Sequence, residues 1–200
     1  MRETTTNENL AQPDRQSDES IVRGTEPVPK RRGSKYADIL LQKLQPTLFS
    51  ENASPVIGVV SFAPRQGVST TAINLGIRAA DHHYAPAIAI DANYRNQKLS
   101  RIYRCSGSGL SDCLNGQADL ENSVYKTKIP GFFTMGAGET KLSKQILFDP
   151  EIGREFFKLL RNDFRLSIID FAAFDEPSVT DSILPCLDGV IVVARYGTRK

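Results

Sequence analysis

The stretch that decides the fold is VIGVVSFAPRQGVSTTAINL, residues 56–75. Its first six residues, 56–61, are uncharged and rich in β-branched side chains, which is typical of a strand buried on both faces of a parallel sheet. From Ser69 to about residue 81, alanine, leucine and isoleucine recur at helical spacing. The loop between them carries Gly67, Ser69 and Thr70. The stretch therefore resembles a strand, a phosphate-binding loop and a helix.

The loop departs from the usual phosphate-binding form, G-x-x-x-x-G-K-[ST], in which a lysine contacts the phosphates and a hydroxyl reaches magnesium. Phe62 stands at the first glycine position and Val68 at the lysine position. The alternative is a plain strand-to-helix turn capped by Ser69 or Thr70. The residues that we predict to bind the phosphates are Pro64, Arg65, Gln66, Gly67, Val68, Ser69 and Thr70.

Further strands and helices alternate along the chain. The pattern predicts helices over residues 36–45 (ended by Pro46), 150–161 and 178–187, and strands over residues 87–90, 132–135, 166–170 and 190–195. Buried, uncharged strands that alternate with helices predict an α/β fold with a mostly parallel sheet flanked by helices. Residues 1–35 are polar and lack aromatic side chains, so we expect a disordered N-terminal tail before a domain that spans residues 36–200.

Two aspartates stand at the ends of predicted strands. Asp91 follows the strand over residues 87–90, and Asp170 ends the strand over residues 166–170. Ligands of open α/β sheets bind beyond the carboxyl ends of the strands, so both carboxylates should lie near the loop. With the hydroxyl of Ser69 they would offer the oxygen ligands that Mg²⁺ prefers. The alternative for each aspartate is an N-cap or turn carboxylate.

Composition excludes several classes of protein. The chain has 200 residues and a formal charge of +2, which does not favour a dedicated nucleic-acid binder. Its apolar runs fall far short of the ~20 residues that span a bilayer, and its start lacks the pattern of a secretory signal. Three cysteines without CxxC spacing predict reduced thiols. We therefore expect a cytoplasmic protein.

Taken together, residues 36–200 resemble the cytoplasmic ATPase domain of the bacterial protein-tyrosine kinases of capsule and exopolysaccharide synthesis. This family belongs to the deviant P-loop ATPases, which include septum-site and plasmid-partitioning proteins. The loop fits the family pattern S-x-A-P-G-x-G-K-S-T-x-x-x-N-L at eight positions. IAIDANYRNQKLSRIY, residues 88–103, resembles the second acidic motif, and RLSIIDFAAF, residues 165–174, resembles the Walker B stretch.

The resemblance implies a P-loop fold that binds ATP and Mg²⁺. Asp91 would be the catalytic residue, and Ser69, Asp91 and Asp170 would bind the metal. The implied partner is a membrane-embedded polysaccharide chain-length regulator or an active kinase paralogue, which would bring the protein to the inner face of the membrane. The helix over residues 36–45 lacks the family pattern linked to ring assembly, so we expect self-association to be weak.

The departures from the family fall where the chemistry should be. Val68 replaces the phosphate-binding lysine, Arg65 a glycine and Asn93 the second carboxylate of the second acidic motif, while residues 171–173 replace Thr-Pro-Pro. The sequence ends at Lys200, before the final strands and the tyrosine-rich tail of the family. Loss of one charged hydrogen bond, roughly 1.5–3 kcal/mol, should weaken nucleotide binding by about 10- to 100-fold.

These departures predict a degenerate, non-catalytic relative that serves as a regulatory or partner protein in polysaccharide synthesis or export. The alternative is an active ATP-dependent protein-tyrosine kinase or ATPase with an atypical loop, in which Arg65 replaces the missing cation. A positive φ at Arg65 would instead strain that loop. A positioning ATPase of the partitioning type is disfavoured, because Ala63 stands where that class carries an extra lysine.

Overall fold

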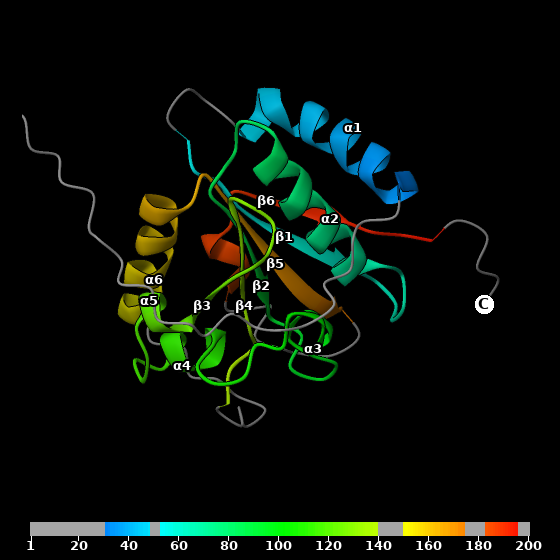
Figure 1. Cartoon of the computed structure of the whole chain (residues 1–200). Helices are drawn as coiled ribbons and strands as arrows, with labels where there is room; N and C mark the ends of the chain where they lie inside the picture. The colour runs from blue at the N-terminus through cyan, green and yellow to red at the C-terminus, as the bar shows by residue number, and fades with distance from the viewer. Residues whose placement is uncertain (1–30, 49–52, 140–149, 175–182, 196–200) are drawn as a thin grey trace, which may run out of the picture.

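The strands of the described chain form one sheet in the order β3-β4-β2-β5-β1-β6 (Figure 1). The computed structural model describes residues 31–48, 53–139, 150–174 and 183–195. The strands are β1 (Val56–Ser61), β2 (Ala87–Asp91), β3 (Val124–Lys126), β4 (Phe132–Met135), β5 (Leu166–Ala173) and β6 (Gly189–Val192). All neighbours pair in parallel except β3 and β4, which are antiparallel. The predicted α/β fold with a mostly parallel sheet is thus confirmed.

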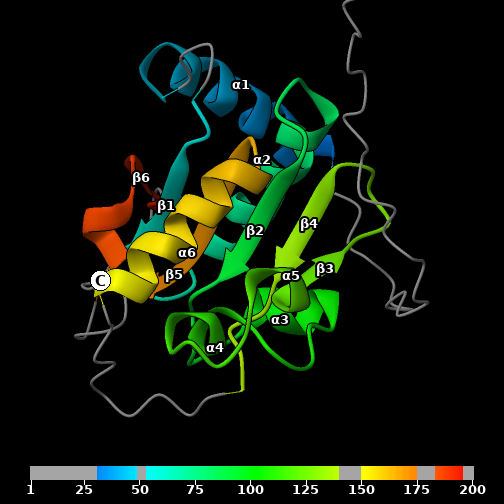
Figure 2. The same ribbon diagram turned by 90° about the vertical axis from the view of Figure 1, so that its left-hand side faces the viewer.

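Helices cover both faces of the sheet. They are α1 (Arg31–Leu48), α2 (Val68–Asp81), α3 (Lys98–Tyr103), α4 (Leu110–Leu114), α5 (Leu120–Ser123) and α6 (Pro150–Asp163). Alternate residues of a strand point to opposite faces, so Ile57 of β1 packs in the core beneath α1 and α2, whereas Val56 packs in the core beneath α6. Figures 1 and 2 show α1 and α2 on one side of the sheet and α6 on the other.

Parts of the sequence-based prediction need correction. Helix α1 begins at Arg31, earlier than residue 36, and continues to Leu48, beyond Pro46. A proline removes one backbone hydrogen bond, and so close to the end of a helix the remaining turn can persist. The tail over residues 1–30 lies outside the described residues, as does the first half, residues 178–182, of the helix predicted over 178–187. The described remainder of that segment forms a short 3₁₀ turn, Leu184–Cys186.

The strands agree more closely with the prediction than the short helices do. β5 extends beyond the predicted residues 166–170, and β6 ends before the predicted residue 195. The pattern did not predict β3, α3, α4 or α5, which have between three and six residues each. Within the described residues, no helix has both the length and the apolar character needed to cross a membrane.

Candidate phosphate-binding site

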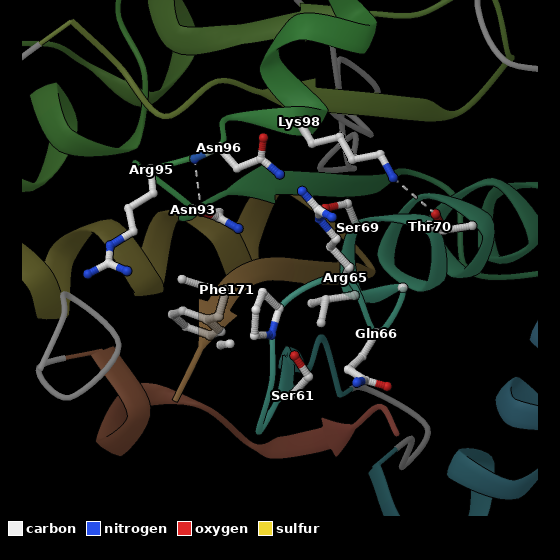
Figure 3. A pocket seen from close by; sticks show the side chains of 15 residues that line it. Ser61, Arg65, Gln66, Ser69, Thr70, Asn93, Arg95, Asn96, Lys98 and Phe171 are labelled. Atoms are coloured by element: carbon white, nitrogen blue, oxygen red, sulfur yellow. Dashed lines mark hydrogen bonds between the residues drawn. The ribbon is translucent and has the colours of Figure 1, made fainter. Parts of the chain in front are cut away.

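A cavity of about 630 Å³ opens where β1, β2 and β5 end (Figure 3). All seven residues predicted to bind phosphate, 64–70, line it. The remaining lining comes from Ser61, from the segment after β2 and from the end of β5, residues 171–173. Arg65, Arg95 and Lys98 supply three positive charges, and the lining includes no aspartate or glutamate. The cavity therefore favours an anionic ligand.

The loop adopts left-handed backbone conformations at two positions. Gly67, the N-cap of α2, has φ 105°, and Arg65 has φ 63°. Glycine adopts such angles freely, whereas the Cβ of arginine makes them costly. Arg65 therefore strains the loop, as expected from the sequence if φ at this position is positive. The first helical hydrogen bond runs from the amide of Thr71 to the carbonyl of Gly67, at 2.9 Å.

No side chain caps the start of α2, whose N-cap is Gly67, so the capping role that the alternative of a plain turn gave to Ser69 or Thr70 is wrong. The first amides of a helix have no partner within the helix, and here they lie at the cavity wall formed by residues 67–70. A helix N-terminus also carries a partial positive charge. The loop thus presents to the cavity the features that bind phosphate in other proteins.

The side chain of Val68 belongs to the hydrophobic core. It is 9% exposed and lies in the same cluster as Ile57, Val59 and Ala72. The position at which the resemblance expects a phosphate-binding lysine is therefore filled by an apolar side chain that packs against the sheet. Residue 68 lines the cavity but brings no charge to it.

Asp91 is fully buried at the end of β2 and is held by three hydrogen bonds. Its Oδ2 accepts from the amide and the hydroxyl of Ser100, at 2.9 and 2.8 Å, and its Oδ1 accepts from the amide of Asn93, at 3.0 Å. Burial raises the pKa of Asp91, and these hydrogen bonds oppose the rise. Asp91 therefore stabilises the turn after β2. It is also paired with Asp170 on the neighbouring strand β5.

Asp170 is also fully buried, but neither of its carboxylate oxygens accepts a well-formed hydrogen bond from the described residues. Burial and the neighbouring Asp91 raise its pKa to about 7, against the opposing influence of the Ser69 hydroxyl and Lys98. Because only the Ser69 hydroxyl lies close to it, this buried carboxylate is costly to desolvate unless a ligand satisfies it. Asp91 is paired with Asp170 on the neighbouring strand, and the Ser69 hydroxyl lies close to Asp170, so the three predicted metal ligands are neighbours. Of the three, only Ser69 lines the cavity, and both aspartates lie buried behind its wall.

Sequence reasoning noted Asn93 only as a departure from the family and did not predict that Asn96 and Lys98 line the site. The amide of Asn96 donates to Oδ1 of Asn93 at 3.1 Å, so the side chain that replaces the second carboxylate stabilises a turn. Nζ of Lys98 donates to Oγ1 of Thr70 at 3.4 Å, and Figure 3 shows its side chain extending toward the start of α2. The signal was present, because Asn93, Asn96 and Lys98 lie in the second acidic motif.

Comparison with known proteins agrees with this fold. No family model matches the chain. It is 25% identical over 172 residues to the tyrosine-protein kinase CpsD of Streptococcus agalactiae, covering 85% of this chain and 73% of that protein. The kinase domain of the Escherichia coli tyrosine kinase ETK superposes with a TM-score of 0.68 at 18% identity, over 84% of this chain and 65% of that domain. The chain thus spans slightly less than two thirds of that solved domain.

A second class of structure shares the fold. The septum-site-determining protein MinD of Pyrococcus horikoshii, complexed with Mg-ADP, superposes with a TM-score of 0.57 at 23% identity, over 70% of this chain and 57% of that one. The fold of the protein is accordingly that of the P-loop ATPases. The resemblance to the bacterial protein-tyrosine kinases, indicated by the sequence motifs, is confirmed by these relatives.

Proposed function

We propose that the protein binds Mg·ATP in the cavity without transferring phosphate to tyrosine, and that it regulates or assists polysaccharide synthesis or export. One observation carries this proposal: the residue at the lysine position, Val68, is part of the hydrophobic core. The loop keeps the shape and the free helix N-terminus for a phosphate ligand, but the charge that should stabilise its transfer is absent from that position.

Binding is supported by three features of the site. The glycine N-cap of α2 leaves the first amides of the helix available at the cavity wall, residues 67–70. The lining is cationic, as a polyphosphate requires. Asp170 is a buried carboxylate whose oxygens accept no well-formed hydrogen bond from the described residues, and a metal ion would supply a partner for them. When bound, Mg²⁺ would bring positive charge to the phosphates, and Ser69, Asp91 and Asp170 are the residues that would hold it.

Loss of catalysis follows from the same geometry. Phosphoryl transfer depends on positioning and on positive charge around the transferred group. Val68 contributes no charge, and Asn93 stands in place of a carboxylate and instead accepts a hydrogen bond from the turn after β2. The alternative function, an active protein-tyrosine kinase or ATPase, is favoured by the retained Ser69, Asp91 and Asp170.

The role in polysaccharide synthesis rests on the relatives, which are tyrosine-protein kinases. By resemblance, the protein would work in the cytoplasm, at the inner face of the membrane. Its partner would be a membrane-embedded chain-length regulator or a kinase paralogue, to which a nucleotide-bound form would present a different surface from the empty form.

Two measurements on the same protein test the proposal. Titration of a fluorescent ATP analogue should show binding that strengthens when Mg²⁺ is added. Incubation with labelled ATP should leave no label on tyrosine. Label that appears on tyrosine and disappears in Asp91→Ala would establish the alternative, an active kinase. Failure of the folded protein to bind the analogue with or without Mg²⁺ would overturn nucleotide binding.

A further inference from the structure

Lys98 occupies an unusual position for a lysine. It is the first residue of α3, where the partial positive charge of a helix N-terminus disfavours a cation. Its side chain is half-buried and lines the cavity. Among the described residues it forms no ion pair, and its hydrogen bond goes to a neutral hydroxyl, that of Thr70. The fold therefore holds this ammonium at the cavity without a direct ion pair to any of the described residues, although its charge is felt by the buried Asp170.

The surroundings of Lys98 all favour a negatively charged ligand. Its hydrogen bond to Thr70 places the ammonium beside the first turn of α2, where the free helix amides lie. Its charge also acts on Asp170, whose pKa it lowers, so the ammonium lies near the predicted metal ligands. Arg65 and Arg95 also line the cavity, and no aspartate or glutamate does.

We propose that Lys98 supplies the cation that position 68 lacks, binding the β- and γ-phosphates of the nucleotide from the opposite wall of the cavity. The inference rests on the proposed nucleotide binding and names a residue of the same site. The lysine of the usual loop would stand at position 68 in α2, whereas Lys98 comes from the segment after β2 and lies 28 residues beyond Thr70 in the sequence. In this protein the phosphate-binding cation would therefore come from a different wall of the cavity than in the usual loop.

Lys98 suits this role better than Arg65 does. Arg65 also lines the cavity, but its left-handed backbone, at φ 63°, is costly for a residue with a Cβ. Lys98 already contacts the residue next to Ser69, through an exposed hydrogen bond at 3.4 Å. Such a long contact contributes little to the fold, and an arriving phosphate can replace it with a charge-assisted bond.

The test compares the affinities of ATP and AMP, measured by displacement of a fluorescent ATP analogue in the presence of Mg²⁺. Lys98→Gln should weaken ATP binding by at least about tenfold, the low end of a charged hydrogen bond, and leave the affinity for AMP within about twofold. Lys98→Arg should retain most of the ATP affinity. The matched control is Lys43→Gln, an exposed lysine of α1, which should change neither affinity.

A relocation variant completes the test. Adding Val68→Lys to Lys98→Gln should return most of the lost ATP affinity, because it restores the cation to the other wall. If the parent protein binds ATP and Lys98→Gln binds it equally well, the role of Lys98 is wrong while nucleotide binding stands. If the parent protein does not bind ATP, the proposed function itself is wrong. A loss in Lys98→Gln that falls equally on ATP and AMP would overturn the assignment to the terminal phosphates.

Discussion

Asp91 and Asp170 are paired residues on the neighbouring parallel strands β2 and β5, so two fully buried carboxylates lie side by side next to the phosphate loop. Their surroundings differ. Asp91 accepts three hydrogen bonds from Asn93 and Ser100, whereas Asp170 has only the nearby hydroxyl of Ser69 and accepts no well-formed hydrogen bond from the described residues. The fold therefore stabilises one charge by itself and leaves the other to a ligand.

The first prediction concerns the pH dependence of stability without metal or nucleotide. The pKa of Asp170 rises from 3.8 to about 7 on folding. Between these values the unfolded chain has released the proton and the folded protein retains it, so the free energy of unfolding should fall as pH rises from about 4 to about 7. Asp91, whose pKa is also raised, acts in the same direction. Urea unfolding at several pH values measures this fall.

Asp170→Asn is the control for this prediction. Its amide cannot ionise, so the free energy of unfolding should fall less across the same pH range. Addition of Mg²⁺ with a nucleotide at pH 8 should raise the melting temperature of the parent protein and not that of Asp170→Asn, because binding to the native state stabilises it. Identical pH slopes for the two proteins would show that Asp170 does not titrate there.

The second prediction isolates the backbone of the loop. Gly67 has φ 105°, and a Cβ added there would meet no atom within 4 Å. Gly67→Ala should therefore lower the free energy of unfolding through backbone strain alone, by about 1–2 kcal/mol. Arg65→Gly removes such strain, but glycine has more entropy in the unfolded chain, so a gain of at most about 1 kcal/mol is expected. Denaturant unfolding gives both values. If the two substitutions changed the free energy of unfolding in the same direction, backbone strain would not explain their effects.

Much of the fold could be predicted because its central strands β1, β2 and β5 are largely apolar runs that are buried on both faces. The short elements could not. The backbone of α3 is tied by Asp91 through Ser100, and this contact between separate segments leaves no periodic signal. The loop residues were recognisable from their spacing. Two features of the site could not be predicted: Val68 packs in the core, and Lys98 donates a hydrogen bond to Thr70. Both depend on how α2 packs against the sheet and against the segment after β2. The sequence indicated that a positive φ at Arg65 would strain the loop, but it did not predict that φ is positive there.

The last prediction asks whether the loop still works as a phosphate cradle when its usual residues return. The double substitution Arg65→Gly, Val68→Lys removes one positive charge and adds another, so the net charge of the cavity stays the same. Any change in affinity then reports where the charge lies. The amides of α2 and the oxygens of Ser69 and Asp170 remain available. We expect Mg·ATP binding to tighten by at least about tenfold, the low end of a charged hydrogen bond.

The competing outcome is structural. Val68 lies in the core with Ile57 and Val59, and a lysine there must extend its charged end into the cavity or be buried at a cost. If the cavity does not receive the ammonium, the double variant should lose stability and gain no affinity. Arg65→Gly alone serves as the control, because it changes the loop backbone without adding the lysine. Measuring ATP affinity and melting temperature for all three proteins separates the outcomes. Unchanged affinity in a well-folded double variant would show that a lysine at position 68 makes no productive contact with the phosphates in this site.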